Sequence, residues 1–173
     1  NVSGAFDQAL KLNGGFVPPF CSGAFFLYSP SLNWLRSALG FNPLKEYLFI
    51  VFVAPVGPYF KGGFATTPFV IMRQYDRSAP LGTGKYKIGG NYAARLVAND
   101  HANKLCYSNI FYLDAREKKY MDECGAANFF GIKDNTYITP KSESILPSIT
   151  NKSLMALAEE IGMKVERRQI PVE

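Results

Sequence analysis

Histidine and cysteine are scarce in this sequence. Its 173 residues include one histidine, His101, and three cysteines, Cys21, Cys106 and Cys124, with no Cys-x-x-Cys spacing. A single histidine excludes most metal sites built on imidazole ligands, so we expect no metal. An odd set of widely spaced cysteines is typical of free thiols in a reducing compartment. We therefore expect a cytoplasmic protein, with mitochondria left open because trimming of the N-terminus could have removed a signal.

Long runs of like charge or of apolar residues are also lacking. The net charge is +5, and the lysines are scattered rather than gathered in the runs typical of nucleic-acid tails. The longest apolar stretch, YLFIVFVAPVGPYF at residues 47–60, is broken by Pro55, Gly57 and Pro58 and is too short to span a bilayer. The first residues do not have the pattern of a signal peptide. We expect neither a nucleic-acid partner nor a membrane.

The composition is that of a globular protein, with 47% hydrophobic and 19% charged residues. Helical spacing and end signals predict helices over residues 4–12, 31–41, 91–105 and 151–161, the last ended by Gly162. In the third of these, Ala94, Val97 and Ala98 are expected on one side, and Thr150 is expected to cap the fourth. Apolar runs predict strands over 24–30, 46–56 (buried), 68–78, 85–88, 109–115 and 163–172, and around a turn at Asp134-Asn135. This mixture predicts an α/β or α+β fold.

Two lysines precede a glycine pair in the segment GTGKYKIGGNYAARL. Lys87 ends a predicted strand, and Gly89-Gly90 indicates a sharp turn or a close approach of the backbone to another group. Tyr92 follows in the first turn of a helix. Taken singly, a surface lysine and a packing tyrosine are the commoner interpretations. In an extended strand Lys85 would share the face of Lys87, so spacing alone does not choose between them.

Glu123 and the helix start at Ile149 and Thr150 are further candidates. Glu123 lies in an apolar, strand-like stretch, and a buried carboxylate needs a partner, which favours a site. The amides of Ile149 and Thr150 begin a helix, where anions bind, although many helix starts look alike. A lysine, a phenol, a carboxylate and such a helix start are together the parts that a pyridoxal phosphate enzyme needs.

Longer motifs carry a resemblance to a known family. The stretches GTGKYKIGGNYAA, DECGAANFFG and TPKSESILPSIT resemble signature blocks of the branched-chain amino acid aminotransferases, which are fold-type IV pyridoxal phosphate enzymes. FVPPF, SPSLNWLRSALGFNPLKEYLF and PVGPYFKGG resemble the preceding part of the same family. The resemblance implies that residues 1–60 are the end of a small domain, 61–67 an interdomain loop, and 68–173 much of a larger cofactor-binding domain. Members of this family are about twice as long and form homodimers.

The resemblance also implies roles for the residues that match its motifs. These are Lys87 as the Schiff-base lysine, Tyr92 at the ring oxygen, Glu123 at the pyridine nitrogen, Leu146 packed on the ring, Ile149 and Thr150 at the phosphate, and Arg77 near the cofactor without a firm role. The implied reaction transfers the amino group of leucine, isoleucine or valine to 2-oxoglutarate. The implied partners are these small molecules and a second copy of the chain.

The substrate side matches the family less well. Where the family usually has Leu-Tyr-x-Arg-Pro, this sequence has FFLYSP, which puts Leu27 and Ser29 at the tyrosine and arginine positions. Tyr28 is one position out of register, and a slip of one residue reverses the face of a strand. Ala126, expected at the substrate, stands where some members have threonine. D-amino acid transamination, aminodeoxychorismate lyase activity and a truncated non-catalytic relative therefore remain open alternatives.

Overall fold

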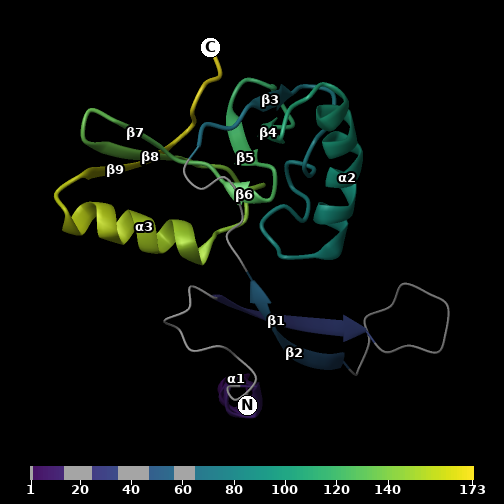
Figure 1. Ribbon diagram of the computed structural model, residues 1–173. Helices are drawn as coiled ribbons and strands as arrows, with labels where there is room; N and C mark the ends of the chain where they lie inside the picture. Colours follow the sequence, from purple (N-terminus) through teal and green to yellow (C-terminus); the bar gives the residue numbers. More distant parts are fainter. Residues whose placement is uncertain (1, 14–24, 35–46, 57–64) are drawn as a thin grey trace. The chain divides into compact units, whose positions relative to one another are not determined.

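The structure is a computed structural model that describes residues 2–13, 25–34, 47–56 and 65–173 (Figure 1). The chain falls into two compact units, Asn1–Ala65 and Thr66–Glu173. Residues 57–64, which include much of the expected interdomain loop, lie outside the described residues. The assignment of the chain to parts of a small and a large domain stays a prediction.

The first unit contains one helix and a two-stranded antiparallel sheet. The elements are α1 (Val2–Asn13), β1 (Phe25–Trp34) and β2 (Tyr47–Val56), with register from Phe25↔Val56 to Trp34↔Tyr47. The helix predicted over 31–41 is wrong in its first part, because cross-strand pairing holds residues 31–34 in β1. Residues 35–46 lie outside the described residues. The strand over 46–56 is confirmed, but it is not buried, since Leu48, Phe49 and Ile50 are each more than a third exposed.

The second unit begins with a β-α-β arrangement. The elements are β3 (Phe69–Met72), α2 (Gly89–Lys104) and β4 (Asn109–Leu113), and β4 is parallel to β3. β5 (Met121–Cys124) and β6 (Ala127–Asn128) extend this sheet in the order β3-β4-β5-β6. Against it, α2 contributes Ala98 and Ala102 to a core with Met72, Ile110 and Tyr112. Small residues one turn apart let the helix approach the sheet closely.

A second β-α-β arrangement follows. The elements are β7 (Gly131–Lys133), β8 (Thr136–Pro140), α3 (Ile149–Glu160) and β9 (Lys164–Arg168), in a sheet of order β7-β8-β9 with β8 and β9 parallel. Asp134 and Asn135 form the predicted turn with φ of 48° and 54°, which is typical of a two-residue hairpin. Gly162 ends the helical segment with φ of 81°, as its position predicted.

Several predicted element bounds are wrong near the ends of strands and helices. The strand expected over 68–78 ends at Met72, and residues 85–88, expected to be a strand, lie instead in a turn and a short extended link before α2. Thr150 does not cap α3. Ser148 does, and its side chain accepts a hydrogen bond from the amide of Asn151. The corrected bounds place Arg77, Lys87 and Leu146 on loops, whereas the other predicted cofactor residues lie in α2, β5 and α3.

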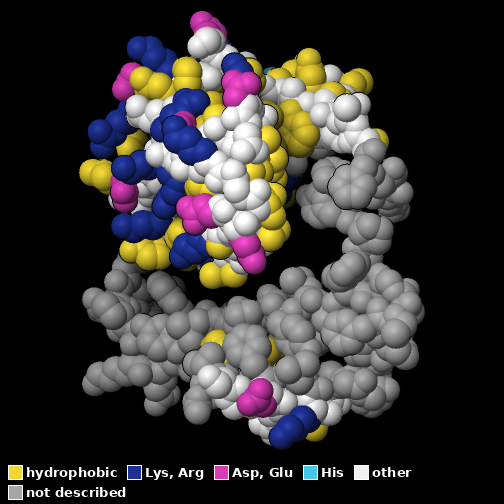
Figure 2. Space-filling model, turned by 90° about the vertical axis from the view of Figure 1, so that its left-hand side faces the viewer, with side chains coloured by type: hydrophobic (Ala, Val, Ile, Leu, Met, Phe, Trp, Pro, Cys, Tyr) yellow, Lys and Arg dark blue, Asp and Glu magenta, His cyan; other side chains and the backbone are white. Residues whose placement is uncertain are grey.

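No helix within the described ranges is both long and apolar enough to cross a membrane. On the face drawn in Figure 2, Lys and Arg side chains are interspersed with Asp and Glu side chains over the second unit. The expectation of no nucleic-acid partner stays a prediction.

Candidate active site

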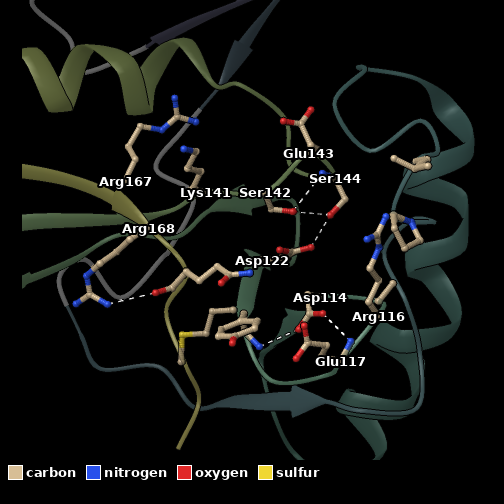
Figure 3. Close-up of a pocket in the computed structure, with 16 residues that line it drawn as sticks. Asp114, Arg116, Glu117, Asp122, Lys141, Ser142, Glu143, Ser144, Arg167 and Arg168 are labelled. Carbon is tan, nitrogen blue, oxygen red and sulfur yellow. Dashed lines mark hydrogen bonds between the residues drawn. The ribbon is translucent and has the colours of Figure 1, made fainter.

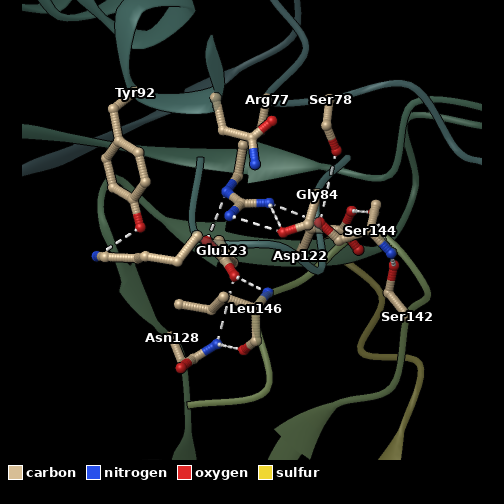
Figure 4. Close-up of polar contacts among 12 residues, drawn as sticks. Arg77, Ser78, Gly84, Tyr92, Asp122, Glu123, Asn128, Ser142, Ser144 and Leu146 are labelled. Carbon is tan, nitrogen blue, oxygen red and sulfur yellow. Dashed lines mark hydrogen bonds and ion pairs between the residues drawn. The ribbon is translucent and has the colours of Figure 1, made fainter. Parts of the chain in front are cut away.

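Three segments of the second unit meet at the predicted site (Figure 4). The first is the β3–α2 loop, residues 73–88, the second is β5, and the third is the β8–α3 loop, residues 141–148. Both loops leave the carboxyl end of a strand and lead into the N-terminus of a helix. Ligands of α/β proteins characteristically bind at such strand ends.

Lys87 and Tyr92 are in direct contact. The Lys87 Nζ donates a hydrogen bond to the Tyr92 hydroxyl at 2.7 Å and lies 4.3 Å from the centre of the ring. This contact follows from local structure, because α2 begins at Gly89 and helical side chains lean toward the helix N-terminus. Lys85 does not share this position. Its ammonium lies 5.5 Å from the ring centre of Tyr86, and the residue lines a cavity of about 210 Å³ that Leu146 and Ser148 also line.

Asn91 anchors the loop that carries Lys87, a role that sequence analysis missed. Its side-chain amide donates to the carbonyls of Thr83 and Tyr86 at 2.8 and 2.9 Å, and its oxygen accepts from the Thr83 hydroxyl at 2.8 Å. Asn91 is buried on the inner face of α2. The feature of the sequence that could have indicated this role is an asparagine directly after the glycine pair, at the start of a predicted helix.

Glu123 is buried on β5, with 2% of its surface exposed. One carboxylate oxygen lies 2.6 Å from the Nε of Arg77, in an ion pair whose side chains are both almost fully buried. The other oxygen accepts from the amide of Leu146 at 2.6 Å and from the side chain of Asn128 at 3.4 Å. The partner that this buried carboxylate needs is therefore an arginine from the lysine-bearing loop.

Burial raises the pKa of Glu123 to about 7, because the charged form loses its hydration. The Arg77 charge and the Leu146 amide act in the opposite direction and lower it, and the Lys87 charge also lowers it. The pKa is raised overall because the effect of burial is larger than the combined effect of these contacts. Lys87 therefore interacts electrostatically with Glu123, and a position of the two groups on either side of one ring stays a prediction.

The N-terminus of α3 lies beside this group. Leu146 connects the two, because its amide bonds to Glu123 and its carbonyl accepts from Asn128 at 2.9 Å. Ser148 caps the helix, so Ile149 and Thr150 are its first two residues, whose amides have no partner inside the helix. Such amides suit a phosphate.

Ala126 is exposed in the turn between β5 and β6. Gly125, before it, has φ of 59°, and a Cβ there would lie 2.2 Å from the side-chain oxygen of Asn109, so this turn requires glycine. Leu27 and Ser29 lie in β1, paired with Ala54 and Phe52. A role of Ala126 at the substrate stays a prediction.

Asp122 is a second buried carboxylate that the sequence analysis missed. It neighbours Glu123 on β5 and accepts a hydrogen bond from the Ser144 hydroxyl at 2.6 Å, and Ser144 in turn contacts Ser142. Burial raises the pKa of Asp122, and these serine hydrogen bonds partly offset the effect. A cavity of about 670 Å³ borders this group, with Lys141 and Arg168 also in its lining (Figure 3).

The residues present fit a phosphorylated aldehyde cofactor better than a metal. No cluster of three or more His, Cys, Asp or Glu side chains that could hold a metal occurs within the described part of the chain. Lys87 offers an amine, Tyr92 a phenol, Glu123 a buried carboxylate and α3 a free helix start. Beyond the adjoining backbone of α2, a Cβ added at Gly89 or Gly90 would meet no atom of the described residues within 4 Å, so packing among these residues does not account for the glycine pair.

The sequence is similar to those of known bacterial enzymes. The chain is 47% identical to a branched-chain-amino-acid aminotransferase of Helicobacter pylori, over 98% of this chain and 51% of that protein. It is 46% identical to the enzyme of that name from Haemophilus influenzae, over 92% of this chain and 48% of that protein. The chain thus spans about half the length of these curated relatives.

Solved structures agree with the fold. The branched-chain amino acid aminotransferase of Escherichia coli matches with a TM-score of 0.60 and 28% identity, over 76% of this chain and 42% of that one. The enzyme of that name from Thermobaculum terrenum, solved in its pyridoxal phosphate form, matches in fold with a TM-score of 0.61 and 20% identity, over 73% and 41%. The predicted α/β fold of fold-type IV is confirmed. Residues 32–173 match the family described as amino-transferase class IV, and the chain belongs to this family.

Proposed function

We propose that the protein carrying this chain is a pyridoxal phosphate-dependent transaminase that moves the amino group of branched-chain L-amino acids to 2-oxoglutarate. The observation that supports the proposal is the Lys87–Tyr92 hydrogen bond beside the loop whose Arg77 pairs with the buried Glu123 carboxylate. The names of the two bacterial relatives support the choice of amino acids.

The chemistry that pyridoxal phosphate supplies when bound is an aldehyde that captures amines and a ring that accepts electrons. Lys87 would hold the aldehyde through its amine and, when freed by the substrate amine, would take up and return the proton at the substrate Cα. Tyr92 accepts a hydrogen bond from the lysine and would donate its own hydroxyl proton to the ring oxygen. The 2.7 Å contact between them keeps the base and the phenol together.

Glu123 would hold a proton at the pyridine nitrogen. With a pKa of about 7, it is largely ionised at slightly alkaline pH, and a cationic ring nitrogen beside it would lower the pKa further. Leu146 would pack on the ring, and Ile149 and Thr150 would bind the phosphate at the N-terminus of α3. Ala126 borders the substrate. Its small side chain leaves the adjacent backbone accessible to a carboxylate.

A different class IV activity is the second candidate. The residues that favour it are Leu27 and Ser29, at the positions where the family usually carries tyrosine and arginine for the substrate carboxylate. D-amino acid transamination and aminodeoxychorismate lyase activity would both retain the cofactor residues. A non-catalytic relative would retain the fold without turnover.

We further propose a homodimer and a cytoplasmic location. The homodimer rests on the family resemblance, and exposed apolar side chains on the second unit, among them Leu81, Leu96 and Val97, are consistent with a protein contact. The location rests on the cysteines. Two plant relatives are named as chloroplastic and mitochondrial, so a localisation experiment on the full chain is the test.

An activity assay with paired variants tests the proposed function. The full chain is incubated with pyridoxal phosphate, 2-oxoglutarate and leucine, and glutamate is measured. D-alanine replaces leucine in a parallel assay, and aminodeoxychorismate is assayed by its own disappearance, because a lyase forms no glutamate. We expect glutamate from leucine, loss of this activity in Lys87→Ala, and retention in Lys85→Ala. Turnover of D-alanine or aminodeoxychorismate alone would favour the second candidate. No turnover and no visible cofactor band would favour a non-catalytic relative.

A further inference from the structure

We infer that Arg77 is a positioning residue that joins the lysine-bearing loop, the Glu123 strand and the phosphate-side loop into one rigid site. This inference rests on the proposed function for its catalytic consequence. Its structural basis is the set of contacts made by a single buried guanidinium group.

All three guanidinium nitrogens of Arg77 contact protein acceptors (Figure 4). The Nε lies 2.6 Å from Glu123, Nη1 donates to the carbonyl of Ser144 at 2.6 Å, and Nη1 and Nη2 donate to the carbonyl of Gly84 at 3.1 and 3.2 Å. Arg77 is 9% exposed. Its donors are directed at the protein, so it acts on the cofactor through Glu123.

Each acceptor lies close in sequence to a predicted cofactor residue. Gly84 is in the same loop as Lys87, and Ser144 is in the same loop as Leu146. The two loops are themselves in contact at this point, because a Cβ added to Gly84 would lie 1.9 Å from the Ser144 carbonyl oxygen. The guanidinium therefore sets the spacing of both loops relative to β5.

Among the described residues, the contacts of Glu123 leave one acceptor position of its carboxylate unused. A carboxylate has about four lone-pair positions. Arg77, the Leu146 amide and Asn128 use three of them. The remaining position is available to a ring nitrogen, and the Arg77 contact fixes the direction in which it points.

The charges facing Glu123 give Arg77 a second effect. Arg77 from the β3–α2 loop and Lys87 from the same loop lower the pKa of Glu123, and Asp122 on β5 raises it. Leu146 and Asn128 contribute neutral donors. Because burial opposes ionisation, loss of Arg77 would leave Glu123 protonated over a wider pH range.

Arginine and lysine differ in what they can do here. A planar guanidinium can reach three acceptors in fixed directions, whereas an ammonium is a point charge on a flexible stem. Arg77→Lys therefore keeps the charge and loosens the geometry, and Arg77→Met removes both. Arg73→Lys is the matched control, because Arg73 precedes Arg77 in the same loop, is 53% exposed and pairs with Glu173 at 3.0 Å on the surface.

The experiment measures two properties of the full chain. The first is the pKa of Glu123 in cofactor-free protein, by carbon-13 NMR of the carboxyl groups assigned with Glu123→Gln. The second is the dissociation constant of pyridoxal phosphate, with kcat and KM for leucine alongside. We expect Arg77→Lys to keep the Glu123 pKa near its wild-type value and to lower cofactor affinity and kcat by about tenfold or more, as loss of a supporting contact does elsewhere. Arg77→Met should also raise the Glu123 pKa.

The outcomes separate the inference from the proposed function. If the wild type fails to bind pyridoxal phosphate, the proposed function fails, and the Glu123 pKa in the variants still decides the electrostatic part of the inference. Arg77 variants that match Arg73→Lys in pKa, affinity and kcat would overturn the inference. Failure of Arg77→Lys to fold would overturn it too, in favour of a purely structural role.

Discussion

Glu123 shows at the scale of one residue how burial and pairing compete. An ion pair at 2.6 Å would ordinarily hold a carboxyl pKa low, yet burial raises the pKa of Glu123 to about 7. The carboxylate and the guanidinium both lose hydration, and a close contact returns only part of that free energy. In the proposed function, a cationic ring nitrogen beside Glu123 would favour the ionised form of this carboxyl group.

This balance predicts how stability depends on pH in the cofactor-free protein. The pKa of Glu123 is raised in the folded state from an ordinary 4.5 to about 7, so the folded state binds the proton more tightly than the unfolded state. The resulting stabilisation is complete below about pH 4.5 and is lost as the pH rises through about 7, by up to about 3 kcal/mol. Asp122 acts in the same direction.

Urea unfolding at pH values from 5 to about 8 measures this effect. Glu123→Gln should flatten the profile, and Glu160→Gln, an exposed carboxylate in α3, should leave it unchanged. An equally steep profile in Glu123→Gln and the wild type would show that another group is responsible.

At the scale of secondary-structure elements, the first residues of α2 and α3 hold the loops that precede these helices. The first helical turn of α2 holds Asn91 against the loop before it, and Asn91 forms hydrogen bonds with Thr83 and Tyr86. Ser148 has a comparable function at α3 as the cap of the helix. The helix starts therefore position Lys87 and the phosphate-side amides.

Asn91→Ala tests this role of α2. The substitution leaves the carbonyls of Thr83 and Tyr86 without their donor, and we expect a loss of about 2 kcal/mol in the free energy of unfolding. Pyridoxal phosphate affinity should fall as well, because the Lys87 loop loses its anchor. Asn103→Ala, an exposed position on the same helix, is the control for both urea unfolding and cofactor titration. Equal behaviour of the two variants would contradict the proposed anchor.

Sequence analysis predicted element types better than element contacts. It found α2 but expected Val97 on the packed side, whereas Val97 is 57% exposed and the buried positions are Asn91, Ala98 and Ala102. The first buried residue of the helix, Asn91, is polar because its side chain forms hydrogen bonds with the preceding loop. A search for apolar residues at helical spacing cannot identify such a residue as buried. The strand expected at 85–88 failed for a related reason, since hydrogen bonds to Asn91 bend this segment.

The site was predicted in its residue types and only partly in its geometry. Motif resemblance identified Lys87, Tyr92 and Glu123, which need particular chemical groups and therefore leave a clear sequence pattern. The partner of Glu123 was not predictable, because Arg77 is distant in the chain and the two side chains meet only in the folded second unit. Pairing with β2 likewise extended β1 beyond the predicted end at residue 30.

At the scale of the whole molecule, every predicted cofactor residue lies in the unit Thr66–Glu173. The atypical positions, Leu27 and Ser29, lie in the unit Asn1–Ala65. The predicted cofactor residues and the two atypical positions thus fall in different units. Substitutions in the first unit should change which amino acid is used, and substitutions in the second should change whether any is used.

Covalent labelling tests the central claim most directly. The full chain is mixed with pyridoxal phosphate, reduced with borohydride, weighed intact and mapped by peptide mass spectrometry. We predict one phosphopyridoxyl group per chain, attached to Lys87, with Lys85 unmodified. No added mass, or a label on Lys85 in place of Lys87, would contradict the account.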